Sequence, residues 1–191
     1  MGGTYNPPHI GHLHAANAAR EQLGFSKIIL IPSNIPPHTE LPKYTASAQA
    51  RLEMTRLAAK VIDAEVSDIE ILRKGKSYTA DTLEQLKELY PNDELYFIVG
   101  TDMLLTIESW FEPHRIFKVA KIAAIARDYD DKAKILAHIE KLKPLGAEVH
   151  FVDAKPLPIS STELRENIAD LFEYLPDGVF EYIAQEHLYE V

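Results

Sequence analysis

The chain has 191 residues, of which 46% are hydrophobic and 26% are charged, a composition typical of one ordinary globular domain. Its formal net charge of −9 argues against a broad nucleic-acid-binding surface, so we expect no nucleic-acid partner. The absence of cysteine excludes disulfides and thiolate metal sites and fits a reducing cytosol, so we expect a cytoplasmic protein. The sequence has no apolar run of about 20 residues and no signal-peptide pattern, so we expect neither a membrane span nor secretion.

Short β-rich runs alternate with longer helical patterns along the chain, which indicates a parallel α/β sheet. We expect a single domain over residues 1–191 with a doubly wound, Rossmann-like sheet and flanking helices. The predicted elements, in chain order, are a helix over 13–23 stopped by Gly24, a buried strand over 27–32, a helix over 48–62, a more exposed strand over 66–72, a helix over 83–90, buried strands over 95–99 and 122–126, a helix over 130–143, a short strand over 149–152, a helix over 161–170 and a last helix from near Pro176.

The N-terminal segment contains the adjacent glycines Gly2 and Gly3, then two prolines and the sequence His9-Ile10-Gly11-His12. The glycines let the backbone turn tightly and approach a ligand with no Cβ in the way. His9 and His12 share a face on the first turn of a helix, where unpaired N–H groups and the helix dipole favour phosphate. The segment therefore predicts a site that holds a polyphosphate beside two imidazoles. The alternative for such a pair is a structural core histidine or a helix cap.

Two later motifs also point to an anionic ligand. Ser160-x-x-Glu163 is a capping box and predicts a helix start, which taken alone needs no further role. Arg165 lies within about one turn of that start, where the helix dipole disfavours a cation, and a bound anion would remove the conflict. Gly100 and Asp102 follow a predicted strand at the sheet edge where α/β folds bind ligands, so Asp102 is a candidate ribose ligand or a helix N-cap.

Read together, the motifs resemble a known family. The pattern from Gly2 to His12 is similar to the opening signature of the nucleotidyltransferases related to class I aminoacyl-tRNA synthetases. Within that superfamily the chain resembles the bacterial nicotinate-nucleotide adenylyltransferases over nearly its whole length, which implies their doubly wound nucleotidyltransferase fold. The other shared blocks are Pro36-Pro37-His38, Ser77-Tyr78-Thr79-Ala80-Asp81-Thr82, Gly100-Thr101-Asp102, Ser109-Trp110, Arg127 and Ile159-Ser160-Ser161-Thr162-Glu163-Leu164-Arg165.

The resemblance implies an ATP site built from the N-terminal loop and the last motif. His12 is expected to be the chief ligand of the charge that develops on the phosphates in the transition state, with His9 and Arg165 as further catalytic residues. Asp102 is expected to help hold the nucleotide. The complete implied ATP site is Gly2, Gly3, Thr4, His9, His12, Gly100, Asp102, Ile159, Ser160, Ser161, Thr162 and Arg165.

The resemblance also implies a pocket for the second substrate. Trp110, the one tryptophan of the chain, is expected to stack on a pyridine ring, while donors at Tyr78 and Thr79 receive the carboxylate of that ring. Without the resemblance, Thr79 would be interpreted as a helix cap and Trp110 as a core or surface aromatic residue.

A proline-rich loop completes the implied substrate site. Asn34 and His38 are expected near the substrates, as is Arg127 after a later strand. Other members often carry Arg or Lys directly after Pro-Pro-His, whereas this chain has Thr39, so Lys43 is the candidate for that phosphate contact. Local sequence alone would predict an ordinary loop here.

The implied reaction joins nicotinate mononucleotide and ATP to give deamido-NAD and pyrophosphate, by direct in-line attack on the α-phosphorus. Mg²⁺ is expected to bridge the phosphates, held by substrate and water, with no metal ligand from the protein. Three alternatives stay open: an adenylyltransferase for nicotinamide mononucleotide or phosphopantetheine, a fragment of a synthetase, and a non-catalytic ATP-binding module. The Ser-Tyr-Thr and Trp110 blocks argue against the first, and the short acidic chain argues against the second.

The start of the chain raises one further expectation. In the resembled family a hydrophobic strand leads into the Gly-Gly turn and lies centrally in the sheet, whereas only Met1 precedes Gly2 in this chain. Removing a central strand would expose two strand edges and open the core, so we expect the natural chain to begin a few residues upstream.

Overall fold

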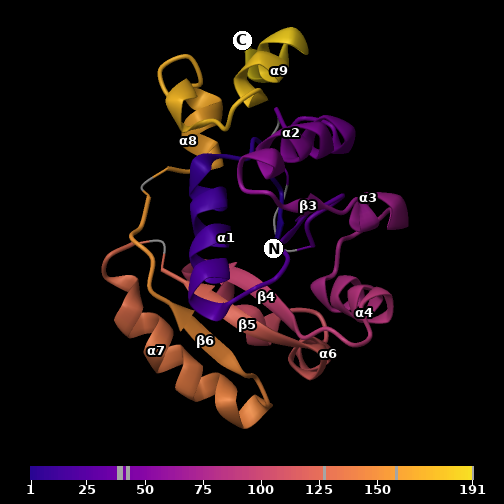
Figure 1. Ribbon diagram of the computed structural model, residues 1–191, viewed down its shortest axis with the longest axis vertical. Helices are drawn as coiled ribbons and strands as arrows, with labels where there is room; N and C mark the ends of the chain where they lie inside the picture. The colour runs from indigo at the N-terminus through magenta and orange to yellow at the C-terminus, as the bar shows by residue number, and fades with distance from the viewer. Residues whose placement is uncertain (38–40, 42–43, 127, 158, 191) are drawn as a thin grey trace.

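The computed structural model describes residues 1–37, 41, 44–126, 128–157 and 159–190, in which parallel strands alternate with helices (Figure 1). The strands are β1 (Gly2–Gly3), β2 (Ile29–Pro32), β3 (Glu65–Val66), β4 (Leu95–Gly100), β5 (Ala120–Ile125) and β6 (Val149–Val152). The α-helices are α1 (Ile10–Leu23), α2 (Ala48–Val61), α3 (Ile69–Arg73), α4 (Thr79–Leu89), α5 (Thr101–Leu104), α6 (Pro113–Val119), α7 (Asp131–Leu142), α8 (Ser161–Glu166) and α9 (Val179–Gln185), and short 3₁₀ helices occupy Ile107–Ser109, Lys143–Leu145, Phe172–Tyr174 and Leu188–Glu190. No helix within these ranges is both long enough and apolar enough to cross a membrane.

The strands form two three-stranded parallel sheets, in the orders β1-β2-β3 and β4-β5-β6. β1 pairs with β2 through only two residue pairs, Gly2 with Ile31 and Gly3 with Pro32. Among the described residues no ladder joins β1 to β4. The structure therefore places β1 at the edge of the first sheet instead of at the centre of one continuous sheet, and the strand expected upstream of Met1 stays a prediction.

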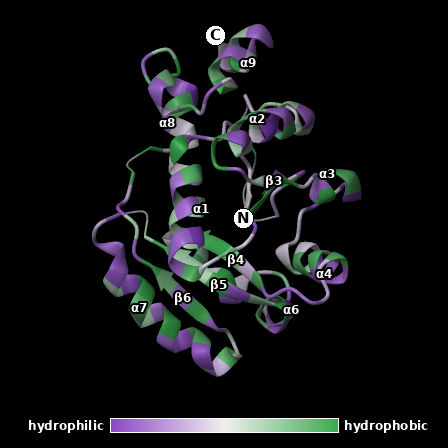
Figure 2. Cartoon of the chain, in the orientation of Figure 1, coloured by the Kyte–Doolittle hydropathy of each residue, from purple (hydrophilic) through white to green (hydrophobic). Residues whose placement is uncertain are grey.

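Helices cover both faces of the sheets, which confirms the doubly wound α/β class. α1 packs on one face of the second sheet through Ala19, while α4 and α7 bury Leu83 and Ile135 on the opposite face. α2 and α9 share one hydrophobic core with the first sheet, to which they contribute Met54 and Ile183. Both α4 and α7 carry a hydrophobic and a hydrophilic side (Figure 2), as expected for helices with one face on a sheet and one in water.

Most predicted elements are confirmed to within a few residues. Gly24 adopts a left-handed conformation, with φ of 71°, and ends α1 as its sequence predicts. The prediction of a strand over 66–72 is wrong, since β3 covers only Glu65–Val66 and the chain then forms α3. Alternating polarity does suit a strand, but the ladder ends at the pair of Leu30 with Val66, although β2 continues to Pro32, and Asp68 then becomes the N-cap of α3. The helix predicted over 161–170 is shorter than expected and ends at Glu166.

Candidate active site

The N-terminal loop is held by buried contacts that place its glycines at the surface of a cavity. A Cβ at Gly3 would lie 3.1 Å from the Tyr5 ring, so a larger residue here would have to displace that buried ring by a few tenths of an ångström. The Tyr5 hydroxyl donates to the carbonyl oxygen of Met1 at 2.9 Å. On the far side of the loop, the Ser161 hydroxyl donates to the carbonyl oxygen of Pro7 at 2.8 Å. We call residues 2–7 the glycine loop. These bonds join its Tyr5 side chain to Met1 and its Pro7 carbonyl oxygen to the start of α8.

The rings of His9 and His12 lie against each other at the start of α1, as their spacing predicts, with their planes inclined by 38°. Their ring centroids lie 3.8 Å apart, and His9 is buried at the N-cap position. The main-chain N–H of His9 donates to Nδ1 of His12 at 3.2 Å. Because Nδ1 of His12 accepts this bond, the proton of the neutral imidazole is on Nε2, which becomes the donor that His12 can offer to a ligand. Gly11 fits between the His9 ring and Ile159, since a Cβ there would lie 2.9 Å from Nδ1 of His9 and 3.3 Å from Cγ2 of Ile159.

The last motif begins α8 beside the same loop. The Ser160 side chain accepts from the main-chain N–H of Glu163 at 3.2 Å, which confirms the predicted helix cap. The Arg165 guanidinium turns back across the helix start, where it donates to the carbonyl oxygen of Asn6 at 2.7 Å and to the Thr162 hydroxyl at 3.1 Å. The carbonyl oxygen of Asn6 thus supports the cation. Because α8 ends at Glu166, Arg165 lies in the last turn of this short helix, where the dipole favours a cation, so the dipole conflict expected from the sequence does not arise in the structure.

A cavity of about 900 Å³ joins these segments, and we call it the histidine cavity. Every residue of the implied ATP site lies in its wall: Gly2, Gly3, Thr4, His9, His12, Gly100, Asp102, Ile159, Ser160, Ser161, Thr162 and Arg165. His14, which the sequence analysis did not place in the site, also lines the cavity, and its Nε2 lies 2.9 Å from the carbonyl oxygen of Lys155. The structure thus brings together residues that are more than 150 positions apart in the sequence.

A second cavity, of about 700 Å³, lies on the other side of the glycine loop, and we call it the tryptophan cavity. Thr79 at the start of α4 and the half-buried Trp110 both line it. Trp110 packs edge-on against Phe97 at 6.2 Å between centroids, and its indole N–H donates to the Thr106 hydroxyl at 3.2 Å. A flat aromatic wall and the N-terminal turn of a helix therefore share one cavity.

Two further residues of the implied substrate site, Tyr78 and Asn34, lie outside the walls of both cavities. Tyr78 is absent from the walls of the tryptophan cavity, and its ring packs on Phe111 at 4.5 Å between centroids. Asn34 has a supporting position: its side-chain amide donates to Gly75 at 3.1 Å, and its main-chain N–H donates to the Ser77 hydroxyl at 2.9 Å. His38, Lys43 and Arg127 lie outside the described residues.

The two cavities meet along one wall. Gly2, Gly3 and Thr4 line both of them, and so does the exposed carboxylate of Asp102 at the end of β4. The imidazole pair faces one cavity and the tryptophan faces the other. Two elongated ligands could therefore approach the glycine loop from opposite sides and meet there.

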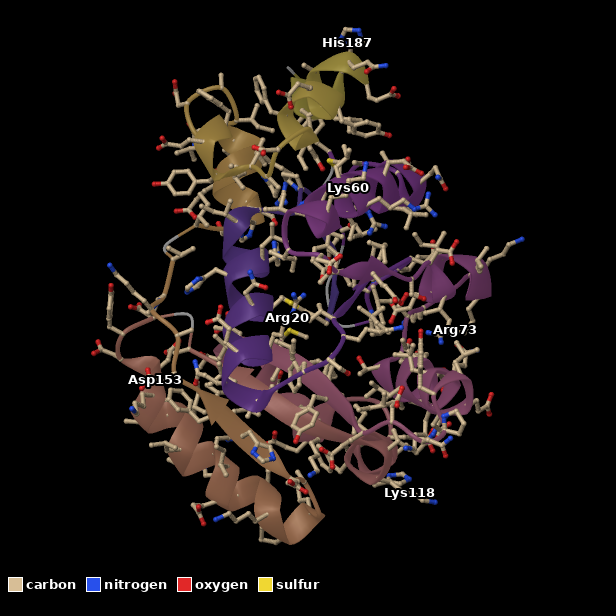
Figure 3. The ribbon with its side chains drawn as sticks, in the orientation of Figure 1. Arg20, Lys60, Arg73, Lys118, Asp153 and His187 are labelled. Atoms are coloured by element: carbon tan, nitrogen blue, oxygen red, sulfur yellow. The ribbon has the colours of Figure 1, made fainter. Side chains whose placement is uncertain are left out.

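A buried carboxyl group lies in the wall of the tryptophan cavity. Glu70 is buried on α3 and accepts from the Thr82 hydroxyl at 2.7 Å. Removal from water raises the pKa of Glu70, while hydrogen bonds from Thr82 and Ser77 and the charges of Arg73 and the Met1 amine act in the opposite direction. The Arg73 side chain, labelled between α3 and α4 in Figure 3, donates to the same Thr82 hydroxyl at 2.8 Å.

Sequence reasoning missed Glu70 and one further buried charge, Arg51 on α2. Arg51 interrupts the apolar face of a predicted helix, whereas Glu70 lies in a segment of alternating polarity. Arg51 lies on the same helix face as Ala48 and Thr55, which belong to the predicted helical pattern. A charged residue on such a face was the available sign of a buried charge. Glu70 fell in the segment wrongly predicted to be an exposed strand.

The described residues offer no cluster of three or more His, Asp, Glu or Cys side chains that could hold a metal ion. Asp102 lines both cavities as a single carboxylate and provides at most one ligand. Any divalent ion that enters this site would therefore take most of its ligands from phosphate oxygens and water.

Comparisons with known proteins agree with the motifs. The chain matches the cytidylyltransferase-like family over residues 1–167. It is 40% identical to a protein of Carboxydothermus hydrogenoformans, over 99% of this chain and 96% of that protein, and 38% identical to a protein of Desulfitobacterium hafniense, over 100% of this chain and 94% of that protein. Both relatives are named "Probable nicotinate-nucleotide adenylyltransferase".

Solved structures with the same fold include the nicotinic acid mononucleotide adenylyltransferase of Plasmodium falciparum in complex with NaAD. It aligns with a TM-score of 0.77 and 20% sequence identity, over 99% of this chain and 95% of that chain, and at this identity the likeness supports the fold alone. The curated relatives are similar enough, and over enough of their length, to decide the family. The chain belongs to the cytidylyltransferase-like family and, within it, to the nicotinate-nucleotide adenylyltransferases.

Proposed function

We propose that the chain transfers the adenylyl group of ATP to nicotinate mononucleotide at the wall shared by the two cavities, giving deamido-NAD and pyrophosphate. The shared wall is the observation that carries this proposal, since Gly3, Thr4 and Asp102 line both cavities. Transfer between two nucleotides requires the phosphate of one to reach the α-phosphorus of the other in line. Two cavities that meet at a glycine loop allow that approach.

ATP would occupy the histidine cavity, with its phosphates between the start of α1 and Arg165. A phosphate oxygen of the mononucleotide forms a bond to the α-phosphorus while the bond from that phosphorus to the bridging oxygen breaks. Pyrophosphate leaves with the electron pair. The Nε2–H of His12 and the Arg165 guanidinium oppose the charge that develops on these oxygens, and both are held in place before the reaction.

Nicotinate mononucleotide would occupy the tryptophan cavity, with its pyridine ring on Trp110. The positive end of α4, which begins at Thr79, suits the ring carboxylate. The placement of Tyr78 against Phe111 leaves Thr79 as the main candidate donor of the predicted pair. A carboxylate accepts hydrogen bonds at both of its oxygens, whereas a carboxamide presents one acceptor and one donor.

Mg²⁺ forms part of this proposal as an ion carried on the phosphates, where it would neutralise charge. The described residues provide no cage of protein ligands for this ion, so phosphate oxygens and water would hold it. The cysteine-free composition supports a cytosolic site of action, which stays a prediction.

The experiment that tests the proposal is a pyrophosphate-release assay with ATP and a panel of acceptors. The acceptors are nicotinate mononucleotide, nicotinamide mononucleotide and phosphopantetheine. We expect turnover with the first and identify deamido-NAD by mass spectrometry. Preferred turnover with either other acceptor would reassign the substrate, and ATP binding with no pyrophosphate release for any acceptor would indicate a non-catalytic module.

A further inference from the structure

Arg51 is a buried cation close to the shared wall but outside both cavities. Its side chain projects from the second turn of α2, and only 1% of its surface is exposed. Arginine is rarely buried this completely unless it is paired, because removing a charge from water is costly. Among the described residues no carboxylate pairs with Arg51, so the reason for its burial must lie in its other contacts.

Those contacts are four main-chain carbonyl oxygens from three loops. Nη1 of Arg51 donates to Thr4 at 2.8 Å and to Ser33 at 2.6 Å. Nη2 donates to Asn34 at 3.1 Å, and Nε donates to Ala46 at 3.2 Å. The planar guanidinium has its donors in a fixed geometry. These bonds therefore help to set the positions of the three loops, beside the main-chain bond from Ser33 N–H to the carbonyl oxygen of Gly3 at 2.9 Å.

Two of the loops held by Arg51 line the candidate substrate sites. Thr4 follows the two glycines and lies in the wall of both cavities. Ser33 follows β2 and lines the tryptophan cavity. From Asn34 the connection continues to Ser77, whose hydroxyl accepts from the Asn34 main-chain N–H at 2.9 Å. A continuous set of hydrogen bonds therefore runs from the glycine loop to the segment that precedes Thr79.

We propose that Arg51 is a positioning residue that aligns the two substrate sites, by holding the Thr4 loop against the Ser33–Asn34 loop with its single guanidinium. The inference rests on the proposed function, in which the two substrates meet at the glycine loop. Arg51 does not contact either substrate. Its effect is on the distance and angle between the attacking phosphate and the α-phosphorus, so it acts on the chemical step more than on the binding of either substrate alone.

The test compares Arg51→Lys and Arg51→Met with a matched control, Arg20→Met. Arg20 on α1 (Figure 3) also donates to main-chain carbonyl oxygens, Ile62 at 2.8 Å and Asp63 at 3.4 Å, but it lies in the wall of neither cavity. For each protein we would measure the dissociation constants of ATP and of nicotinate mononucleotide separately by calorimetry, then kcat, and the urea midpoint of unfolding.

A misalignment of about 1 Å between reacting groups can cost about 100-fold in rate, so we expect kcat to fall about 10- to 100-fold in both Arg51 variants. The Lys variant keeps the charge but has no planar fork, so it should retain more activity than the Met variant and less than the wild type. The separate dissociation constants should change by less than kcat, and Arg20→Met should keep its kcat even where its unfolding midpoint falls.

Three results would overturn the inference. The first is a normal kcat in the folded Arg51 variants. The second is a loss of kcat in Arg20→Met as large as in Arg51→Met, which would make the effect one of general stability. The third is that neither Arg51 variant folds, because a residue that only aligns loops leaves the hydrophobic cores intact. A wild-type protein without turnover is a different outcome, since it would refute the proposed function itself.

Discussion

The main-chain N–H of His9 donates to Nδ1 of His12 at 3.2 Å, and the two imidazole rings lie against each other with their centroids 3.8 Å apart. This relationship fixes both the orientation of the His12 ring and the nitrogen that carries its proton. A histidine held in this way can donate from Nε2 without first having to rotate or exchange its proton. The pair is therefore a prearranged hydrogen-bond donor at the start of α1.

The first prediction is that His12→Ala lowers kcat. Removal of one donor that stabilises transition-state charge typically costs about 100- to 1,000-fold, and we expect a loss in this range with a smaller change in KM. The measurement is steady-state kinetics beside a thermal unfolding curve. His114→Ala is the matched control, because His114 is exposed and lies in neither cavity wall. A kcat close to that of the wild type would mean that the histidine is only a cap.

The second prediction concerns Gly11, which has the His9 ring on one side and Ile159 on the other. A Cβ at this position would lie 2.9 Å from Nδ1 of His9 and 3.3 Å from Cγ2 of Ile159, so Gly11→Ala must displace the buried His9 ring. Alanine also favours a helix over glycine by about 0.5–1 kcal/mol, so the free energy of unfolding should change little. We expect kcat to fall at least about tenfold. Normal turnover would show that the ring pair need not be held in place.

The third prediction is selectivity for the acid over the amide. An uncompensated buried donor costs about 1–3 kcal/mol and a hydrogen bond to a charged group contributes about 1.5–3 kcal/mol, which together give a preference of at least about 100-fold for nicotinate over nicotinamide mononucleotide. Trp110→Ala removes a surface that stacks equally on both rings, so it should raise KM for both acceptors and leave the ratio of kcat/KM nearly unchanged. Equal kcat/KM values for the two acceptors in the wild type would reject the acid-specific assignment.

The fourth prediction is a pH effect that arises from Glu70. Burial raises the pKa of Glu70, so the folded protein holds this proton more tightly than the unfolded chain does. The stability that results is fully present below the unfolded pKa and is lost as the pH rises through the raised, folded-state pKa. Glu70→Gln has no such titration, and its free energy of unfolding should therefore rise relative to that of the wild type as the pH increases.

Urea unfolding of both proteins at about pH 5 and at about pH 8 measures this difference. The groups that face Glu70 are the hydroxyls of Thr82 and Ser77, the Arg73 guanidinium and the Met1 amine. Of these, the Met1 amine also titrates, because burial lowers its pKa to about 5. The Glu70 charge itself raises the pKa of this amine, so Glu70→Gln alters both titrations and the measured difference belongs to the coupled pair. A difference in stability that is the same at both pH values would contradict the prediction.

The fifth prediction is that turnover requires a divalent ion. The described residues provide no cluster of metal ligands, so the ion would be bound mainly by the substrate phosphates. EDTA should abolish pyrophosphate release and added Mg²⁺ should restore it, while the thermal unfolding midpoint of the protein without substrates should not change with EDTA. Full turnover in EDTA would remove the metal from the proposal, and a lower midpoint would indicate a structural ion.

Several parts of the molecule could be predicted because they depend on neighbouring residues. Gly24 ends α1 and Ser160 caps α8 through bonds within a few residues of each, and β4 and β5 are runs of buried residues of the kind that parallel sheets require. The spacing of His9 and His12 placed both rings on one helical turn. For these features the local sequence contained the physical cause.

The sequence by itself thus determined the α/β class, the end of α1 at Gly24 and the cap of α8 at Ser160, since each follows from backbone geometry over a short span. Tertiary structure decided the rest. Segment 66–72 leaves the sheet after Val66 and forms α3, and the Tyr78 ring packs on Phe111 outside the walls of the tryptophan cavity. Arg51 gathers carbonyl oxygens from three loops that are separated in the sequence by helices and strands. Contacts of that kind arise from the folding of distant segments onto one another, and no local pattern of residues encodes them.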